Sequence, residues 1–453
     1  MAGVHSSLYK TMTMTATSVP TPLDIAARFR SARRQTLALC EPLTAEDMMV
    51  QSLPEASPAK WHLAHTAWFF ESFVLGQLQP GYQLFNKDFP WLFNSYYRSF
   101  AAFPEKRLRA SFARPGLDEV LRYRQHVDQA IERLLAQDPE PEALRRIELG
   151  VNHEEQHQEL LLTDILHAFF TNPLKPAYKA EAAADSEFGV PWPQNRDQGH
   201  PYRSGRPALR FHSFPGGIHE IGHSGQGFCF DNELPRHRVW LEPYALAERL
   251  VTCGEFAAFI ADGGYRRPEF WLSDGWNTVQ SAGWQAPLYW LGEPGNWSLF
   301  TLRGEIPLAR VEDVPVCHVS LFEADAYARW AGCRLPTEFE WEAAAESQPC
   351  TGNLLDSARL FPSAVAASIE SGDAVKQLLG DCWEWTASAY LGYPGFKPLP
   401  GTLGEYNGKF MSGQMVLRGG SCATPAAHIR ASYRNFFPPE TRWQFSGIRL
   451  ATL

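Results

Sequence analysis

The sequence predicts a protein of two domains, an N-terminal four-helix bundle followed by an α+β domain with little regular secondary structure. The chain has 453 residues, which is more than one ordinary domain contains. Up to about residue 178, apolar residues recur at helical spacing in four separate segments. From about residue 209 onward, short β-like runs alternate with loops rich in Gly, Pro and Trp. Such a change of pattern along the chain predicts two domains of different class.

Four segments predict the helices of the first domain, which we place at residues 22–178. The first begins at Pro22 with "PLDIAARFRSARRQTLALCEPL", and the second is "SPAKWHLAHTAWFFESFVLGQL", where Ser57 and Pro58 predict a cap and a first-turn proline. The third is "LDEVLRYRQHVDQAIERLLAQ", and the fourth is "PEALRRIELGVNHEEQHQELLLTDILHAFFTN". Four amphipathic helices of this length predict a bundle. Residues 1–21 are polar and are expected to form a disordered tail.

The remainder of the chain predicts a linker and a second domain. Residues 179–208 are polar and rich in Pro and Gly, which is typical of a linker. The second domain then occupies residues 209–453. Within it, "HRVWLEPYAL" and "QMVLRGGS" have the character of strands, and "SLFEADAYARWAG" (320–332) predicts a helix that is followed by "RLPTEFEWEAAA".

Composition and charge argue against several classes of function. The net charge is −9 and there is no long run of Lys or Arg, so neither a nucleic-acid groove nor attraction to an anionic membrane is expected. No apolar run reaches the roughly 18 residues that a membrane helix needs, and no signal peptide is visible. The eight cysteines are scattered without a C-x-x-C pair, so a zinc ribbon or dithiol redox centre has no support. We expect a cytoplasmic protein with free thiols.

The stretch "VNHEEQHQELLLTDILHAFF" (151–170) contains the pattern H-E-x-x-H, formed by His153, Glu154 and His157. In zinc metalloproteases the two histidines of this pattern bind the metal and the glutamate acts on its water. On a helix, His153 and His157 share one face about 6 Å apart along the axis. Gln156 lies about 60° from His153 around that helix. Ordinary surface histidines also occur at this spacing, so the pattern alone leaves metal binding open.

A second pair of histidines lies in the apolar segment "KWHLAHTAWFFE", which contains His62 and His65. A buried histidine on an apolar face is more often a hydrogen-bonded core residue than a ligand. Two histidine-bearing helices of one bundle can nevertheless supply facing ligands to a common interior site. His62 and His65 are about 60° apart around the helix, so at most one is expected to point directly at a metal.

The protease interpretation lacks a third ligand. Zinc proteases of this type add a histidine at the end of an extended motif or a glutamate on a following helix. Here Leu160 stands at the glycine position, Thr163 stands at the third histidine position, and Glu181 and Glu187 fall in the predicted linker. A zinc metallohydrolase is therefore a distant alternative. A three-histidine site leaves positions open for oxygen and substrate, as in non-haem Fe(II) oxygenases, although imidazole also suits Zn, Cu and Ni.

Both halves of the sequence resemble one known family. "SPAKWHLAHTAWFFE", "FNSYY" and "NHEEQHQELLLTDI" are similar to the DinB-like helical domain of the ergothioneine-biosynthesis sulfoxide synthases. "GFCFDNELPRHRVWL", "RLPTEFEWEAAA", "GDCWEWTASAYLGYPGF" and the C-terminal "VLRGGSCATPAAHIRASYRNFFPPETRWQFSGIRLA" resemble their second domain. That domain has the formylglycine-generating-enzyme fold, which is C-type-lectin-like. The resemblance runs from about residue 22 to the C-terminus.

The resemblance implies an activity and a set of iron ligands. These enzymes use Fe(II) and O2 to join a cysteine-type sulfur to C2 of the imidazole of hercynine (trimethylhistidine), which gives a sulfoxide. Carried over by motif, His65, His153 and His157 would hold iron. Gln156 would hydrogen-bond the hercynine imidazole, and Glu154 would be a structural carboxylate rather than a protease base.

The same resemblance assigns aromatic residues to catalysis and substrate binding. In relatives with the "NSYY" segment a tyrosine beside the iron donates a proton, so we expect Tyr96 to be the donor and Tyr97 its neighbour on the substrate side. Asn435, Phe436 and Phe437 fall where the family closes its pocket over the trimethylammonium group, to which aromatic faces are attracted by cation–π interaction. Paired aromatics that merely pack, and a hydrophobic turn before two prolines, are the alternatives.

The segment after the tyrosine pair departs from many bacterial relatives, which have a Gly-Pro-Arg-rich stretch ending in Leu-Ser-Arg-Pro. This chain has "RSFAAFPEKRLRASFARPG" instead. Arginine binds carboxylates bidentately, so Arg109 and Arg114 are our candidates for contacting the donor. The donor stays open between cysteine, γ-glutamylcysteine and the selenosugar of the related selenoneine synthases, and a selenoneine synthase is the alternative function. The basic residues of the segment are Arg98, Lys106, Arg107, Arg109 and Arg114.

The second domain is expected to act as a wall and lid for the site rather than to bring catalysis of its own. Formylglycine-generating enzymes bind copper through paired cysteines, whereas Cys382 and Cys422 stand singly in "GDCWEWT" and "GGSCAT". We interpret both as small buried packing residues.

Overall fold

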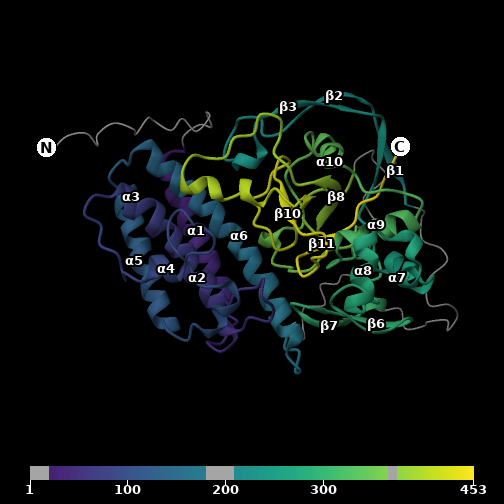
Figure 1. Ribbon diagram of the computed structural model, residues 1–453, viewed down its shortest axis with the longest axis horizontal. Helices are drawn as coiled ribbons and strands as arrows, with labels where there is room; N and C mark the ends of the chain where they lie inside the picture. The colour runs from purple at the N-terminus through teal and green to yellow at the C-terminus, as the bar shows by residue number, and fades with distance from the viewer. Residues whose placement is uncertain (1–19, 180–208, 366–374) are drawn as a thin grey trace.

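A computed structural model describes residues 20–179, 209–365 and 375–453. A helical part and a part with short strands lie side by side, and the long helix α6 runs along their boundary (Figure 1). This architecture confirms the predicted fold class. The predicted tail 1–21 and linker 179–208 fall almost entirely outside the described residues, so the predicted domain boundaries stay predictions.

The four predicted helices of the first domain are all present. Thr21 caps the first of them by accepting a hydrogen bond from the Asp24 backbone N–H at 3.2 Å. The second helix continues through a π-helical turn and one further α-helical turn to Leu78, which is where the predicted segment ends. The π-helical geometry of that turn was not predicted. The main helices are α1 (Pro22–Cys40), α2 (Ala59–Phe70), its extension (Glu71–Leu75) and α3 (Gly76–Leu78), α5 (Leu117–Leu135) and α6 (Pro141–Thr171).

Helices α2 and α6 pack closely enough to bring their polar residues together. Every residue of α2 is buried, and α6 extends over 31 residues, or about 46 Å. At Gly150 of α6 an added Cβ would lie 2.4 Å from Cε1 of Phe70, so a larger residue would force the buried Phe70 ring to move. One turn further along α6, His153 therefore lies beside α2. Two shorter elements, α4 (Phe89–Leu92) and the 3-10 helix Lys106–Ser111, connect α3 to α5.

The second domain is built from small sheets and short helices. Ser320 and Thr337 cap α9 and α10 through capping boxes with Glu323 and Glu340, which confirms the helix predicted within 320–332. The helices are α7 (Cys253–Ala261), α8 (Ser273–Ala282), α9 (Leu321–Trp330) and α10 (Glu338–Ala345). The sheets are β1-β4-β12 (Phe211–Phe214, Tyr244–Ala247, Ala451–Thr452), β2-β3 (Gly217–Ile221, His237–Leu241), β5-β6-β7 (Trp290–Glu293, Asn296–Thr301, Gly304–Pro307) and β10-β9-β8-β11 (Asn435–Phe437, Met415–Arg418, Trp383–Ala389, Ser446–Gly447).

Buried ion pairs hold the loops of the second domain in place. Arg418 at the end of β9 donates to Glu342 at 2.7 Å and to Glu338 at 3.0 Å, both on α10. Arg449 donates to Glu384 of β8 at 2.7 Å. All of these side chains are buried, so each charge is compensated by its partner. Arg418 also donates to the carbonyls of Ala431 at 3.0 Å and Tyr433 at 3.1 Å, in a loop that meets α6.

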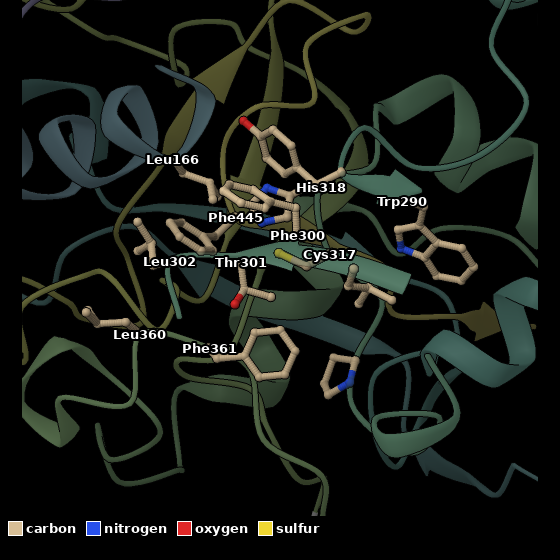
Figure 2. A pocket seen from close by; sticks show the side chains of 13 residues that line it. Leu166, Trp290, Phe300, Thr301, Leu302, Cys317, His318, Leu360, Phe361 and Phe445 are labelled. Carbon is tan, nitrogen blue, oxygen red and sulfur yellow. The ribbon is translucent and has the colours of Figure 1, made fainter. Parts of the chain in front are cut away.

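The two domains are tightly packed where the C-terminal half of α6 meets the second domain. A cavity beside Leu166, Tyr289 and His318 has a volume of about 20 Å³, which is room for roughly one water (Figure 2). It is therefore too small for a substrate. Among the described residues, no helix is long and apolar enough to cross a membrane.

Candidate metal and substrate site

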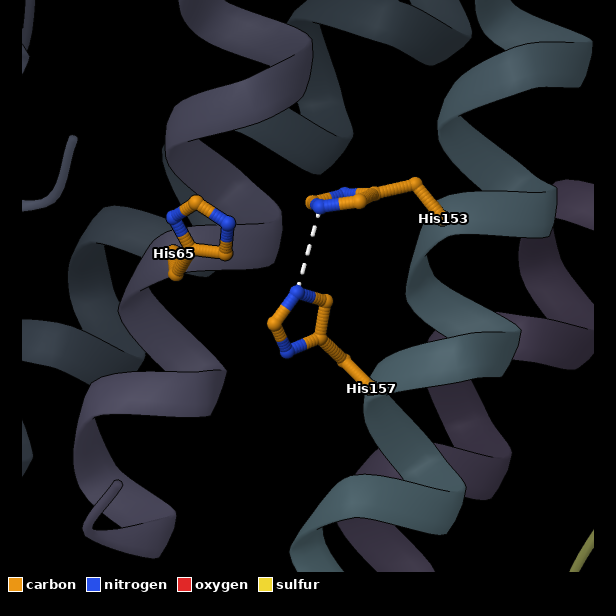
Figure 3. Close-up of side chains that lie close together, drawn as sticks. All are labelled: His65, His153 and His157. Atoms are coloured by element: carbon orange, nitrogen blue, oxygen red, sulfur yellow. Dashed lines mark hydrogen bonds between the residues drawn. The ribbon is translucent and has the colours of Figure 1, made fainter. Parts of the chain in front are cut away.

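Three histidines from two helices converge between α2 and α6. His65 of α2 faces His153 and His157 of α6 (Figure 3), and their candidate ligand nitrogens all lie within 4.8 Å of one another. The Nε2 atoms of His153 and His157 are 3.1 Å apart. The i, i+4 spacing puts both on one helix face, and the close approach of α2 supplies the third imidazole.

The ring of His65 is fixed by its surroundings. Its Nδ1 donates to the carbonyl of Phe93 at 2.7 Å, which leaves Nε2 without a proton. That Nε2 is buried and has no hydrogen-bond partner among the described residues. The imidazole stacks between two indoles, Trp61 at 4.3 Å and Trp68 at 5.1 Å between ring centroids. His65 thus presents an unshared lone pair to the site.

The three imidazoles suit a divalent transition metal. Two nitrogens each about 2.1 Å from one ion and at a right angle to each other are about 3 Å apart, which matches the separation between His153 and His157. Burial lowers the pKa of His153 to about 3 and lowers the pKa of His65 and His157 well below the ordinary value. All three are therefore neutral and able to bind a metal at neutral pH. The donor set suits Fe, Zn, Cu or Ni.

The glutamate of the H-E-x-x-H pattern is engaged elsewhere. Glu154 is fully buried and accepts hydrogen bonds from Arg33 of α1 at 2.8 Å and from Arg124 of α5 at 2.9 Å. Thr36 donates to the same carboxylate at 2.7 Å. Burial raises the pKa of Glu154, but the two guanidiniums hold it at about 2. Its contacts are those of a structural carboxylate that ties α6 to α1 and α5.

Gln156 connects the helical bundle to the second domain. Its Nε2 donates to the hydroxyl of Tyr433 at 2.6 Å, and the hydroxyl of Tyr406 donates to its Oε1. The ring of Tyr406 is also 5.8 Å from that of His153. Sequence reasoning missed both tyrosines, because they lie some 250 residues after Gln156 in loops without periodicity. Together they form a wall beside the three histidines.

One face of α6 makes polar contacts with the second domain along its length. Asn152 lies 3.3 Å from Nδ1 of His428. Two turns later, Glu159 accepts hydrogen bonds from the Trp383 indole at 2.8 Å and from Thr424 at 2.6 Å, as well as from Ser421. The neighbouring face carries His153 and His157. The helix that supplies two candidate ligands therefore also positions the second domain over them.

The predicted tyrosine pair lies at the edge of the same region. The rings of Tyr96 and Tyr97 stack at 4.5 Å, and their hydroxyls are 3.4 Å apart. Tyr97 is fully buried against Trp68, whereas Tyr96 contacts Tyr406 of the second domain at 6.4 Å. Burial raises the pKa of both tyrosines, so both are neutral phenols. The pair is therefore connected to the histidines by ring contacts through two residues: Trp68, which stacks on His65, and Tyr406, which contacts His153.

The predicted C-terminal contacts divide into two groups. Phe436 stacks on Tyr390 at 4.0 Å and lies 5.8 Å from Phe410, whose ring in turn contacts Tyr96 at 5.4 Å. Phe437 packs edge-on against Trp443 at 5.9 Å. The Asn435 side chain accepts from the backbone N–H of Phe436 at 2.9 Å. Phe436 is thus connected to the tyrosine pair through aromatic contacts, and Phe437 lies in a different set of contacts.

The two predicted arginines differ in position. Arg109 is 3% exposed, and its guanidinium lies 3.5 Å above the ring of Trp61, which stacks on His65. It donates to the hydroxyls of Ser57 at 2.7 Å and Ser95 at 2.9 Å. Burial lowers the pKa of Arg109 to about 9. Arg114, in contrast, is exposed. Arg109 is therefore the better placed of the two for a role at the site.

Comparisons with known proteins agree with this architecture. Residues 28–161 match the DinB superfamily, and residues 203–362 and 354–452 match the sulfatase-modifying factor enzyme 1-like domain. The chain is 33% identical over 460 residues to "Hercynine oxygenase" of Mycolicibacterium smegmatis, which covers 94% of this chain and 98% of that protein. It is 33% identical over 450 residues to "Hercynine oxygenase" of Mycobacterium tuberculosis, with 95% and 99% covered. "Ergothioneine biosynthesis protein 1" of Schizosaccharomyces pombe is 28% identical over 235 residues, which is 49% of this chain and 27% of that protein.

Fold and site together define a class of protein in which a DinB-type helical domain and a sulfatase-modifying-factor-like domain enclose a three-histidine site. Within that class, the chain belongs to the hercynine oxygenase family, the ergothioneine-biosynthesis sulfoxide synthases. The resemblance predicted from the sequence motifs is thereby confirmed.

Proposed function

We propose that this chain is a non-haem Fe(II), O2-dependent oxidoreductase that forms a carbon–chalcogen bond at C2 of the hercynine imidazole. The observation that carries the proposal is the cluster of three neutral imidazoles, His65, His153 and His157, which lies beside Gln156 and its partner Tyr406. The two relatives named "Hercynine oxygenase" align with this chain over nearly their whole length. Fe(II) held by the three imidazoles would leave coordination positions for O2 and substrate.

The reaction that we favour couples hercynine to a cysteine-type thiol. Hercynine loses the hydrogen on C2 and the donor loses its S–H hydrogen, while one atom of O2 enters the sulfoxide and the other leaves as water. Gln156 offers a carboxamide N–H that hydrogen-bonds an imidazole substrate in place of the Tyr433 hydroxyl. The trimethylammonium group of the substrate is compatible with an aromatic surface such as Phe436.

Tyrosine hydroxyls supply the protons that this chemistry needs. Burial keeps Tyr96 and Tyr97 protonated, so either phenol holds a proton that it can donate. We assign the donor role to Tyr96, because its ring contacts Tyr406, whose hydroxyl already bonds Gln156. A donor carboxylate would be bound by Arg109, which is buried beside the stacked rings of Trp61 and His65.

A selenosugar donor is the second candidate, which would make the protein a selenoneine synthase. The observation in its favour is that Arg109 already donates to two serine hydroxyls, Ser57 and Ser95, while Arg98, Arg107 and Arg114 are exposed. A polyhydroxylated donor without a carboxylate needs no free guanidinium and is compatible with hydroxyl partners of this kind.

The experiment is anaerobic reconstitution with Fe(II) and hercynine in the presence of cysteine, γ-glutamylcysteine and a selenosugar, followed by O2 and mass spectrometry. We expect a product with sulfur or selenium at C2, and the product mass identifies the donor. His65→Ala is expected to abolish iron binding and turnover, whereas His126→Ala on α5, outside the cluster, retains both. No product with any donor from iron-loaded protein would refute the proposal.

A further inference from the structure

A buried carboxylate lies behind one of the three candidate ligands. Asp164 is on α6 two turns beyond His157, and a separation of seven residues puts both on the same face. Its Oδ2 is 3.0 Å from Nε2 of His62 on α2, and it also accepts the backbone N–H of Ser57 at 2.7 Å. The other ring nitrogen of His62, Nδ1, is 2.8 Å from Nδ1 of His157. A continuous hydrogen-bonded chain therefore runs from Asp164 through His62 to His157.

The direction of these hydrogen bonds follows from what each group is able to donate. An ionised carboxylate accepts hydrogen bonds only, so the proton between Asp164 and His62 is on His62 Nε2. Neutral His62 then has a bare Nδ1, which accepts the Nδ1–H of His157. His157 is left with a bare Nε2, the nitrogen that lies 3.1 Å from His153. The chain thus fixes His157 in the tautomer that a metal ligand needs.

The three candidate ligands differ in the hydrogen-bond partner of their Nδ1 atom. His65 donates its Nδ1–H to a neutral backbone carbonyl, that of Phe93. Nδ1 of His153 is buried and lacks a hydrogen-bond partner within the described part of the chain. His157 is connected to a carboxylate, and that carboxylate is 7% exposed. Of the three candidate ligands, His157 is thus the one that the described residues connect to a carboxylate by hydrogen bonds, through His62.

We propose that Asp164 and His62 are positioning residues for the metal. This inference rests on the proposed function only in that it requires the three histidines to bind a metal. The usual facial site of non-haem iron has two histidines and a carboxylate, whereas this ligand set has three neutral imidazoles. Asp164 supplies a negative charge indirectly, through its hydrogen bond with His62. Carboxylate partners of this kind orient metal-bound histidines and raise their basicity.

A purely structural role for the same contacts would leave a different experimental signature. Asp164 also anchors the start of α2 by accepting from Ser57, so its loss is expected to lower stability in either case. A structural role alone leaves the metal unaffected in protein that still folds. A positioning role changes metal affinity, the spectrum of the bound metal and its reduction potential.

The test compares Asp164→Asn, His62→Gln and His62→Phe with the unaltered protein, without substrates. The asparagine keeps an oxygen for Ser57 and His62 and removes the charge, and the glutamine keeps an acceptor for His157 but breaks the path to the carboxylate. The matched control is Glu71→Gln, because Glu71 is also a fully buried carboxylate in the bundle, bonded to Tyr82 at 2.9 Å. Fe(II) affinity is measured anaerobically against a chromophoric chelator, and the Co(II) absorption spectrum and the Fe(III)/Fe(II) midpoint potential are recorded.

We expect Asp164→Asn and His62→Gln to weaken Fe(II) binding about 10-fold and His62→Phe about 100-fold, the range found for such partners. The midpoint potential rises and the Co(II) bands shift, while Glu71→Gln keeps wild-type metal properties. Wild-type Fe(II) affinity and Co(II) spectra in Asp164→Asn and His62→Phe would overturn the proposal. If Asp164→Asn fails to fold, the two His62 variants decide the matter by the same criteria. Failure of the unaltered protein to bind Fe(II) would instead refute the proposed function, and this inference with it.

Discussion

The contacts of Glu154 predict that its substitution affects stability rather than catalysis. In Glu154→Gln the side chain keeps its shape but loses the charge that Arg33 and Arg124 share. Both guanidiniums are buried, at 4% and 2% exposure of their side chains. Asp128, 2.7 Å from Arg33, is the acidic partner that remains for that side of the network. The variant therefore leaves buried positive charge with too little compensation.

The size of the effect follows from the pKa of Glu154. Although burial raises this pKa, Arg33 and Arg124 lower it from its ordinary value of 4.5 to about 2. At about 1.36 kcal/mol per pH unit this difference corresponds to about 3 kcal/mol of stability. Because the folded-state pKa is depressed, that stability is fully present above about pH 4.5 and is lost as the pH falls through about 2. Loss of one partner from a buried ion pair typically costs about 3 to 5 kcal/mol, which agrees.

Denaturant unfolding of the apo protein at pH 7 measures the change in the free energy of unfolding. The control is Glu132→Gln, which removes an exposed ion pair with Arg30 and is expected to cost less than about 1 kcal/mol. Iron-loaded Glu154→Gln is expected to retain turnover at temperatures where it stays folded. Wild-type stability combined with abolished turnover would refute this reasoning, since it would make Glu154 a catalytic base as in zinc hydrolases.

Three further predictions concern the contact between the domains. Glu159→Ala removes an acceptor of three hydrogen bonds, so hydrogen–deuterium exchange is expected to rise in β8 but not in α1; unchanged exchange in β8 would contradict it. Tyr406→Phe removes the hydroxyl that donates to Gln156, so it is expected to weaken hercynine binding about fivefold, measured by calorimetry, while Fe(II) affinity stays unchanged. An unaltered Kd for hercynine would contradict a role of Tyr406 at the substrate site. Burial raises the pKa of Glu405, but hydrogen bonds from Ser99 hold it at about 2. Hydrogen–deuterium exchange in the Tyr96 loop, corrected for intrinsic rates, is therefore expected to be constant from pH 8 to 5 and to increase toward pH 2. An increase already near pH 6 would contradict a Glu405 pKa of about 2.

Local patterns in the sequence carried most of the information about the bundle. Four apolar periodicities predicted α1, α2, α5 and α6, because each helix must bury one stripe of side chains. The i, i+4 spacing of His153 and His157 likewise predicted a shared face. The choice between His62 and His65 required the actual rotation of α2, since the two differ by about 60° around that helix. In the structure His65 joins the cluster and His62 contacts His157 from behind.

The wall of the site was not predictable in the same way. Tyr406 and Tyr433 lie in loops of the second domain, where no periodicity marks which side chains face α6. Their contacts with Gln156 depend on how the two domains pack, which is fixed by Asn152 and Glu159 on the adjacent face of α6. Family resemblance supplied Gln156, but the two tyrosines emerged from the structure.

Oxygen uptake by Fe(II)-loaded protein, followed with an oxygen electrode, tests most directly whether the three-histidine site supports oxidative coupling to hercynine. We expect rapid uptake when hercynine and a sulfur or selenium donor are both present, with one O2 consumed per C2-linked product. Zn(II)-loaded protein and His65→Ala are expected to consume none. Equal uptake without hercynine, or catalysis supported by zinc in place of iron, would contradict the proposed function.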